Sequence, residues 1–341
     1  MKAVVIEAFG PPQTLKVRDF PTPKPGPGDI LVKVAIAGVC HHDVLHRAGK
    51  LPGAKSGVVP GHETAGEIVA VGAEVTTHAV GDRVVLYQRR FCGQCQNCLR
   101  GRQDMCRALG APAVDTEGGY AEFISVPANM GIKIPDGVDW PAAALACCPI
   151  GTSVRALKTV AAINPGDTVL ITGASGGLGV HQIQIARALG GRPIAVTSSP
   201  AKIDFLRSLG AADVVVAPDL AYSAAVWRLT GKRGVDIAID NVGATLPETL
   251  RCMATGGIAV VLGNVGGEAV PVAPGLLIGR RLRVAGSGMG TLEDVRQSLA
   301  MLQAGMVQPV ISATVKFSEA AAAHAMLEAR SVEGRVVMQG W

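Results

Sequence analysis

The stretch Thr168-Val169-Leu170-Ile171-Thr172-Gly173-Ala174-Ser175-Gly176-Gly177-Leu178-Gly179 decides the fold class of this 341-residue chain. A short apolar run leads directly into a glycine-rich turn, and a helical pattern follows at residues 181–186. Strand, turn and helix in this order are typical of the first unit of a dinucleotide-binding domain. Glycines let the backbone approach a pyrophosphate, and the helix N-terminus supplies free N–H donors. We therefore predict that Gly176, Gly177, Leu178 and Gly179 bind a dinucleotide.

The residues after this turn repeat the alternation of strands and helices. Further strand-like runs lie at residues 193–197, 213–216, 235–240, 257–262 and 282–285, and the first predicted helix covers residues 175–189. Strands that alternate with helices form parallel sheets. The pattern predicts an α/β fold with a doubly wound, six-stranded parallel sheet over residues 151–287.

The remainder of the chain has a different pattern. Residues 1–150 contain short apolar runs separated by Pro and Gly, which predicts loop-rich, mostly β structure. Two helical patterns at residues 292–304 and 318–329 precede the apolar run 335–338. We expect residues 288–341 to complete the first domain.

Composition limits the class of protein. The chain is 48% hydrophobic and 17% charged, which suits two ordinary domains. Lys and Arg number 32 against 27 Asp and Glu, and no basic run occurs, so a nucleic acid is not an expected partner. No run of about 18 apolar residues is present, and Glu7 interrupts any signal-like start. We expect a cytoplasmic protein without a membrane partner.

The end of the second predicted strand concerns the choice of dinucleotide. A site for NAD usually places Asp or Glu there, whereas this chain has Thr197, Ser198 and Ser199. These hydroxyls and Lys202 can accept a 2′-phosphate without carboxylate repulsion, which favours NADP over NAD. In the alternative interpretation, Ser198 or Ser199 only caps the helix that follows Pro200.

The eight cysteines are unevenly distributed, which favours metal sites over disulfides. Four of them lie within fifteen residues, namely Cys92, Cys95, Cys98 and Cys106. Four thiolates close a tetrahedral shell and leave no open position, so they predict a structural zinc ion. Disulfides are the alternative, and a cytoplasmic location disfavours them.

A second possible metal site is dispersed over the first 150 residues. Cys40, His62 and Cys148 would leave a fourth position for water or a substrate oxygen, and Glu63 adjoins His62. Spacing alone leaves a second possibility open, because a buried cysteine is often only a small apolar core residue.

Taken together, the motifs resemble those of the zinc-dependent medium-chain dehydrogenases/reductases, the alcohol dehydrogenase-like family, over essentially the whole chain. The matching motifs are Cys40-His41-x-Asp43, Gly61-His62-Glu63, Val80-Gly81-Asp82-Arg83-Val84, the four-cysteine segment, Gly118-Gly119-Tyr120-Ala121-Glu122 and the glycine-rich turn. The resemblance implies a GroES-like catalytic domain that carries two zinc ions and a Rossmann domain in the middle of the chain.

The resemblance also implies roles for single residues. Cys40, His62 and Cys148 would hold the catalytic zinc, with Glu63 as a supporting group or alternative ligand. Asp43 would orient a ligand, and His41 and Arg335 would reach the pyrophosphate. The nicotinamide would lie near Thr152 and the segment Gly263-Asn264-Val265. Cys147 and Cys252 are expected in the core.

Several positions depart from the pattern of alcohol dehydrogenases. His42 replaces the usual Ser or Thr, and it could transfer the substrate proton, pack over the metal or coordinate it. Leu45 lies three positions beyond His42, where a further relay histidine would be needed, so that relay is absent. His46 is displaced by one position from that site and is expected on the surface. Arg89 and Arg90 could bind a carboxylate or phosphate of the substrate, although a solvated pair is the more common outcome.

Three functions follow as hypotheses. The leading one is a zinc-dependent, NAD(P)-dependent oxidoreductase that interconverts alcohols and aldehydes or ketones. The second is reduction of an activated double bond, as in acryloyl-CoA reductases, which the segments 172–179 and 240–243 and the adjacent His181 resemble. The third is a nucleotide-binding protein without turnover. A homodimer or homotetramer is expected.

Overall fold

A computed structural model describes residues 1–110 and 117–341, which form two compact units. Unit 1 comprises residues 1–151, 290–303 and 311–341, and unit 2 comprises residues 152–289 and 304–310. The predicted assignment differs at residues 304–310, which belong to unit 2 rather than to the first domain. The reason is local hydrogen bonding, since the N–H groups of Gln308 and Val310 donate to Gln184 and His181 of unit 2.

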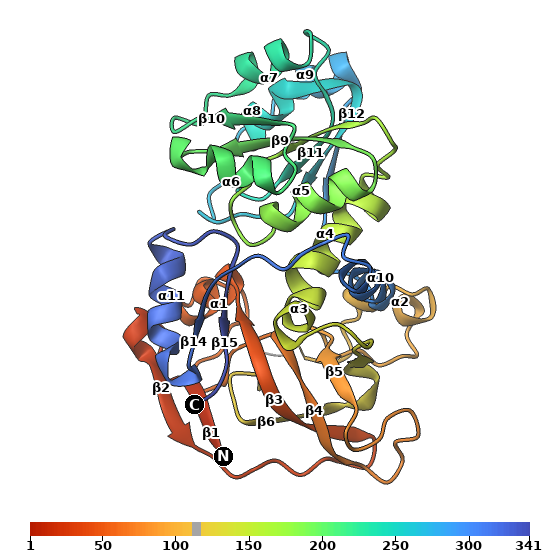
Figure 1. Cartoon of the computed structure of the whole chain (residues 1–341), viewed down its shortest axis with the longest axis vertical. Coiled ribbons are helices and arrows are strands. Elements are labelled where there is room, and N and C mark those ends of the chain that lie inside the picture. Colours follow the sequence, from red (N-terminus) through yellow and green to blue (C-terminus); the bar gives the residue numbers. More distant parts are fainter. Residues whose placement is uncertain (111–116) are drawn as a thin grey trace. The chain divides into compact units, whose positions relative to one another are not determined.

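Unit 2 is built on a six-stranded parallel sheet with the order β10-β9-β8-β11-β12-β13 (Figure 1). The strands are β8 (Thr168–Ile171), β9 (Arg192–Thr197), β10 (Asp213–Val216), β11 (Val235–Asp240), β12 (Met253–Val261) and β13 (Arg283–Gly286). Buried aliphatic side chains fill its core, as in the fully buried run β8. The predicted doubly wound α/β fold is confirmed.

Five α-helices of unit 2 connect successive strands, and one short helix precedes β8. They are α4 (Thr152–Val154), α5 (Gly179–Ala188), α6 (Ile203–Ser208), α7 (Ser223–Leu229), α8 (Leu246–Cys252) and α9 (Pro274–Arg280). Helix α5 begins at Gly179 and not at residue 175 as predicted, because residues 173–178 form the turn itself. A Cβ atom on Gly179 would lie 2.6 Å from Ala174 Cα, so only glycine allows helix α5 to begin this close to the backbone of the preceding turn.

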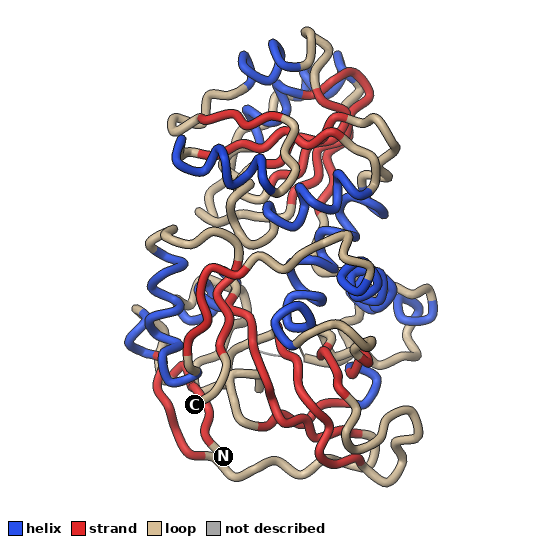
Figure 2. The backbone as a smooth tube through the Cα atoms, in the orientation of Figure 1, coloured by secondary structure: helices blue, strands red, loops and turns tan. Residues whose placement is uncertain are grey.

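Unit 1 contains a mostly antiparallel sheet, whose strands are coloured red in Figure 2. Its order is β14-β15-β3-β4-β5-β7, and β6 also pairs with β3. The strands are β3 (Asp29–Val39), β4 (Glu63–Val71), β5 (Arg83–Leu86), β6 (Phe123–Pro127), β7 (Gly131–Lys133), β14 (Ile311–Val315) and β15 (Arg335–Met338), and β1 (Lys2–Ile6) pairs separately with β2 (Leu15–Asp19). The C-terminal strand β15 lies against β3, so the end of the chain completes this unit.

Two helices of unit 1 match the patterns predicted at residues 292–304 and 318–329, whereas its shorter helices were not predicted. The helices of this unit are α1 (His41–Arg47), α2 (Gln96–Leu99), α3 (Trp140–Leu145), α10 (Leu292–Gln303) and α11 (Ala320–Glu328). Helix α3 continues into a π-helical turn, Ala146–Gly151, that carries Cys147 and Cys148. Among the described residues, no helix combines the length and the apolar character that crossing a bilayer requires.

Candidate metal centres and cofactor site

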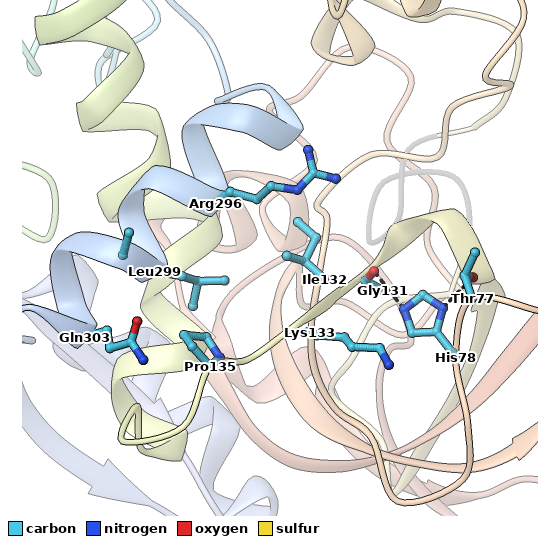
Figure 3. Close-up of a pocket in the computed structure, with 10 residues that line it drawn as sticks. Thr77, His78, Gly131, Ile132, Lys133, Pro135, Arg296, Leu299 and Gln303 are labelled. Atoms are coloured by element: carbon cyan, nitrogen blue, oxygen red, sulfur yellow. Dashed lines mark hydrogen bonds between the residues drawn. The ribbon is translucent and has the colours of Figure 1, made fainter.

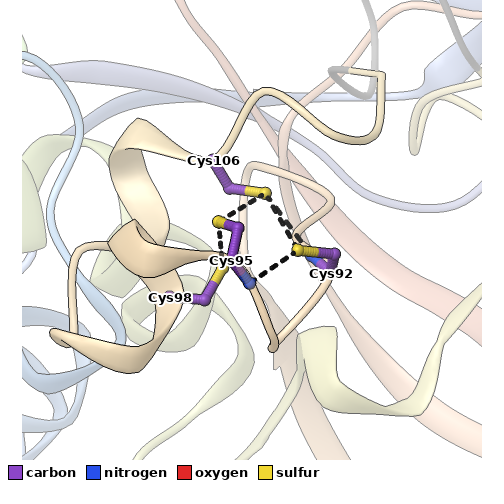
Figure 4. Close-up of side chains that lie close together, drawn as sticks. All are labelled: Cys92, Cys95, Cys98 and Cys106. Atoms are coloured by element: carbon purple, nitrogen blue, oxygen red, sulfur yellow. Dashed lines mark hydrogen bonds between the residues drawn. The ribbon is translucent and has the colours of Figure 1, made fainter.

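The four clustered cysteines converge in space (Figure 4). The distance between the sulfur atoms is 3.5 Å for Cys95 and Cys98, 3.8 Å for Cys106 and Cys92, and 4.0 Å for Cys95 and Cys106. A tetrahedral zinc ion with bonds of about 2.3 Å to sulfur requires sulfur atoms about 3.8 Å apart. All eight cysteines are free thiols, so the cluster is not a pair of disulfides.

Backbone N–H groups donate to two sulfur atoms of this cluster. The N–H groups of Cys92 and Cys95 donate to sulfur atoms of the cluster at 3.4 Å. Hydrogen bonds from the backbone of Gln94 and Cys95 lower the pKa of Cys92 to about 6. The sequence left open whether Arg89 contacts a substrate or is a solvated surface residue. In the structure Arg89 donates from Nε to the carbonyl oxygen of Cys106 at 2.6 Å and braces the cysteine loop.

A second cluster brings together the dispersed residues Cys40, His62, Glu63 and Cys148, whose ligand atoms all lie within 4.8 Å of one another. The register of β3 against β4 pairs Gly38 with Glu63, which places the end of one strand beside the start of the other. The π-helical turn supplies Cys148. Sulfur and imidazole nitrogen are the ligands that zinc prefers in proteins, so these residues fit a zinc ion.

Asp43 orients the histidine of this cluster. It is fully buried, and its Oδ1 lies 3.0 Å from His62 Nδ1. Burial alone would lower the pKa of His62, but the charge and hydrogen bond of Asp43 raise it well above its usual value. A carboxylate at Nδ1 favours a proton on that nitrogen, so a metal that binds His62 would take the place of the proton on Nε2. The second oxygen of Asp43 accepts from the Cys40 N–H at 3.0 Å and from the Tyr120 hydroxyl at 3.3 Å.

Arg335 lies against the metal-ligand set. Its guanidinium donates to Glu63 Oε1 at 2.6 Å and lies 3.5 Å from Cys40 Sγ and 3.6 Å from Cys148 Sγ. Only 6% of Arg335 is exposed, and in this conformation the arginine engages Glu63; the contact with a pyrophosphate that the resemblance implied stays a prediction. Burial raises the pKa of Glu63 to about 7, although Arg335 opposes this shift.

The histidines of helix α1 have different surroundings. The His42 ring is exposed and lies 5.2 Å from the His62 ring at an angle of 77°. A second possible set of metal ligands consists of His42, Asp43 and His62. His41 is half-buried, and burial lowers its pKa. The prediction that His46 is a surface residue is wrong. His46 is fully buried, and its Nε2 lies 2.9 Å from the Lys55 carbonyl oxygen, because it occupies the inward face of a short helix.

Gln88 was not singled out in the sequence. It lies two residues after β5, only 8% exposed, and its Nε2 makes no hydrogen bond within the described part of the chain. Its backbone hydrogen-bonds to the thiol of Cys147, the neighbour of Cys148. A buried donor without a partner costs free energy, so such groups often meet water or ligand. No sequence pattern signals this property.

Cys147 and Cys252 are fully buried, as expected.

Most predicted cofactor residues of unit 2 lie at or directly after the carboxyl ends of strands β8, β9 and β12. Lys202 Nζ donates to the Ser175 hydroxyl at 3.2 Å, which joins the glycine-rich turn to the segment after β9. Thr197 is buried, Ser198 is exposed, and the Ser199 side chain does not cap the following helix. Thr152 is buried at the start of unit 2. Gly263, Asn264 and Val265 follow β12 directly after Leu262.

A pocket of about 470 Å³ in unit 1 involves none of these residues (Figure 3). Its polar side chains already have partners. His78 is bonded to Thr77 and to the Gly131 carbonyl oxygen, and Lys133 pairs with Asp82 at 2.8 Å. The pocket therefore does not resemble a reactive site.

Comparison with known proteins identifies the family. Residues 26–136 match the model of the alcohol dehydrogenase GroES-like domain, and residues 177–304 match that of the zinc-binding dehydrogenases. An acryloyl-coenzyme A reductase of Sulfurisphaera tokodaii is 31% identical over 99% of this chain and 100% of its own length. This chain belongs to the zinc-type medium-chain dehydrogenase/reductase family. The predicted family and the GroES-like and Rossmann architecture are thereby confirmed.

Other members of the zinc-type medium-chain dehydrogenase/reductase family are similar to this chain over nearly its whole length. An NAD-dependent alcohol dehydrogenase of Saccharolobus solfataricus is 33% identical over 99% of both chains. The crystal structure of a protein named AibC superposes with a TM-score of 0.94 at 40% identity, covering 100% of this chain and 96% of the other. These relatives include enzymes that act on alcohols and on acryloyl-coenzyme A. The protein is therefore an oxidoreductase, and the hypothesis of a nucleotide-binding protein without turnover is wrong.

Proposed function

We propose that this enzyme interconverts an alcohol and its aldehyde or ketone, with a zinc ion at Cys40, His62 and Cys148 and a second zinc at the four clustered cysteines. The observation that carries this proposal is the convergence of the Cys40 and Cys148 sulfur atoms and a His62 ring nitrogen within 4.8 Å of one another. Glu63 pairs with Arg335 through Oε1 and keeps Oε2 unpartnered among the described residues, so we assign the two thiolates and the imidazole as the ligand set and Glu63 as an alternative ligand. Such a set leaves one position of a tetrahedral shell for a substrate oxygen.

The surrounding residues support this chemistry. When bound, zinc polarises the substrate oxygen as a Lewis acid and the nicotinamide cofactor supplies the hydride. Asp43 holds His62 in the tautomer that exposes Nε2. His42 lies beside His62 with an exposed ring, which suits it to exchange the substrate proton with solvent.

We infer NADP as the preferred dinucleotide. The end of β9 carries hydroxyls at Thr197 and Ser198 where NAD sites carry a carboxylate. Lys202 is held over the glycine-rich turn by Ser175 and offers a positive charge to a 2′-phosphate. We assign the pyrophosphate to residues 176–179 and the nicotinamide to Thr152 and residues 263–265.

A second candidate function is reduction of the activated double bond of an enoyl thioester. The observation in its favour is the full-length similarity to acryloyl-coenzyme A reductases from two organisms, at 31% and 32% identity. Leu45 and His42 also replace the residues that relay a proton in alcohol dehydrogenases of the family. The Nε of Arg90 is buried without a partner and could donate to a polar group of such a substrate.

The adjacent cysteines provide a matched test. Cys148→Ala removes a proposed zinc ligand, whereas Cys147→Ala removes a fully buried thiol that is not a proposed ligand. NADPH oxidation is measured for both variants and the wild type with aldehydes, ketones and short enoyl-CoA esters, and zinc is quantified in each sample.

The leading proposal expects carbonyl turnover and two zinc ions in the wild type and in Cys147→Ala. Cys148→Ala should lose one zinc and, with it, carbonyl turnover by about a hundredfold or more. Carbonyl turnover that survives Cys148→Ala would refute the proposed role of zinc. Turnover confined to enoyl-CoA esters would assign the enzyme the second function.

We further propose that the enzyme is a homodimer. Strand β13 is at the edge of the unit 2 sheet, and the adjacent helix α9 exposes Ile278 by 78%. Val284 on β13 is 42% exposed, and an edge strand with free polar groups is a template for pairing with a second copy. Light scattering after Val284→Lys should give a monomer, and a dimer that persists would exclude this edge as the interface.

A further inference from the structure

The first step concerns where two neighbouring strands of unit 2 end. Strands β8 and β11 pair in parallel, with Ile171 opposite Ile239. Beyond them the chain diverges, since β8 is followed by β9 on one side of the sheet and β11 by β12 on the other. Ligands of doubly wound sheets bind at such a divergence, outside the carboxyl ends of the strands. Thr172 and Asp240 occupy this point.

Asp240 is a fully buried carboxylate that is surrounded by donors. Its Oδ1 accepts from the N–H groups of Val242 at 3.0 Å and Gly243 at 2.8 Å. The hydroxyl of Thr245 lies 2.8 Å from both oxygens, and that of Thr249 lies 2.9 Å from Oδ2. The carboxylate therefore fixes the shape of the loop that follows β11 but has no surface on which to touch a cofactor.

This loop is tied to both ends of the glycine-rich turn. At the start of the turn, the Thr172 hydroxyl accepts from the Asn241 N–H at 3.2 Å and donates to Asp240 at 3.4 Å. The Asn241 amide donates to the Thr172 carbonyl oxygen at 2.8 Å. Beyond the turn, the side-chain amides of Asn241 and Gln182 exchange two hydrogen bonds, at 2.7 and 3.0 Å, and Gln182 lies in helix α5.

The same loop also supports the segment assigned above to the nicotinamide. The N–H of Leu262 donates to the Asp240 carbonyl oxygen at 2.8 Å, and that of Val265 donates to the Val242 carbonyl oxygen at 3.1 Å. The backbones approach so closely that a Cβ atom on Gly263 would lie 1.9 Å from the Asn241 carbonyl oxygen. The positions of the turn and of residues 263–265 are thus both set by one loop.

We propose that Asp240 is a positioning residue for the cofactor, which acts through a clasp formed by Thr172, Gln182, Asp240, Asn241 and Thr245. The clasp fixes the pyrophosphate turn relative to the nicotinamide segment, so it governs binding of the complete dinucleotide and not of its adenosine end. The adenosine end depends on Thr197, Ser198 and Lys202, which lie outside the clasp. This inference rests on the cofactor site proposed above.

Two substitutions of identical chemistry separate this role from a merely structural one. Thr172→Val removes the hydroxyl that joins the loop to the turn. Thr249→Val removes a hydroxyl bonded to the same carboxylate, but its other partner is Tyr222 at 2.7 Å, away from the turn. Asp240→Asn provides a conservative variant that keeps one acceptor oxygen for the two loop N–H groups.

Binding of NADPH and of adenosine 2′,5′-bisphosphate to the zinc-loaded full chain is measured by fluorescence titration, with thermal unfolding of each variant in parallel. Thr172→Val should weaken NADPH binding about tenfold, as expected for lost hydrogen bonds, and change the affinity for the adenosine fragment less than about twofold. Thr249→Val should lower the unfolding temperature without weakening NADPH binding, and Asp240→Asn should fall between the wild type and Thr172→Val.

Equal NADPH affinity of the wild type and Thr172→Val would overturn the inference alone. Equal weakening by Thr172→Val and Thr249→Val would also overturn it, since the clasp would then matter only for stability. A wild type that binds neither NADPH nor the adenosine fragment would instead overturn the cofactor site itself. A rise in the KM for NADPH with little change in kcat would support the positioning role independently.

Discussion

His324 on helix α11 provides a sharp test of the buried polar groups in unit 1. The side chain is fully buried, and neither ring nitrogen has a hydrogen-bond partner within the described part of the chain. Its ring packs edge-to-face on Tyr120, with centroids 6.1 Å apart. Burial lowers the pKa of His324 from 6.5 to about 4, while the charges of Asp43 and Cys40 oppose this shift and those of Arg47 and His41 add to it.

The pKa shift has a definite consequence for stability. Above pH 6.5 the imidazole is neutral in both the folded and the unfolded chain, so protonation of His324 does not change the free energy of unfolding. As the pH falls from 6.5 to about 4, the unfolded chain takes up a proton that the folded chain excludes. Each pH unit then lowers the free energy of unfolding by about 1.4 kcal/mol, to a total of about 3 kcal/mol.

The experiment compares the wild type with His324→Leu and His324→Gln by urea denaturation between pH 8 and pH 5. Neither variant has a titrating group at this position. The wild type should therefore lose about 2 kcal/mol relative to each variant over this range. Both variants should show the same pH dependence even if their absolute stabilities differ. A difference between wild type and variants that does not change with pH would refute the conclusion that burial keeps His324 neutral.

Three further substitutions test separate parts of the site. Cys98→Ser should lower the zinc content by one equivalent and reduce the free energy of unfolding by several kcal/mol, because a closed four-thiolate shell contributes directly to folding. Metal analysis and denaturation measure these two quantities. An unchanged zinc content would disprove the four-cysteine zinc site. Lys202→Ala should raise the KM for NADPH about tenfold and leave that for NADH unchanged, whereas an equal effect on both would remove the case for a 2′-phosphate contact. Gln88→Met keeps the volume of the side chain but removes its unpaired amide. If that amide binds a second polar oxygen of the substrate, kcat/KM should fall only for substrates that carry one. A uniform change across a substrate series would contradict this role of Gln88 in substrate recognition.

The parts of this site that were predictable from the sequence are those formed by local contacts. The cysteines from Cys92 to Cys106 lie within one short loop, so their spacing alone nearly determines their convergence. The same holds for the glycine-rich turn, whose residues all lie between β8 and α5. The alternation of strand and helix in unit 2 likewise has a clear sequence period.

The remaining contacts depend on tertiary structure and could not be read from spacing. Glu63 and Arg335 are separated by 272 residues and meet only because β15 returns to pair with β3. Helix α1 is seven residues long, too short for a periodic pattern to reveal that His46 faces the interior. The unpaired amide of Gln88 is a property of its surroundings and has no sequence signature.

The path of the chain between the two units limits how this enzyme can be divided. The chain passes from one unit to the other after residues 151, 289, 303 and 310. A fragment that ends at residue 151 would lack β15, and β3 would then present an unpaired edge. A fragment of residues 152–289 would in turn lose the segment whose backbone bonds to His181 and Gln184. Neither unit can therefore be excised as one continuous piece, and a functional split would require fragments that reassociate after separate synthesis.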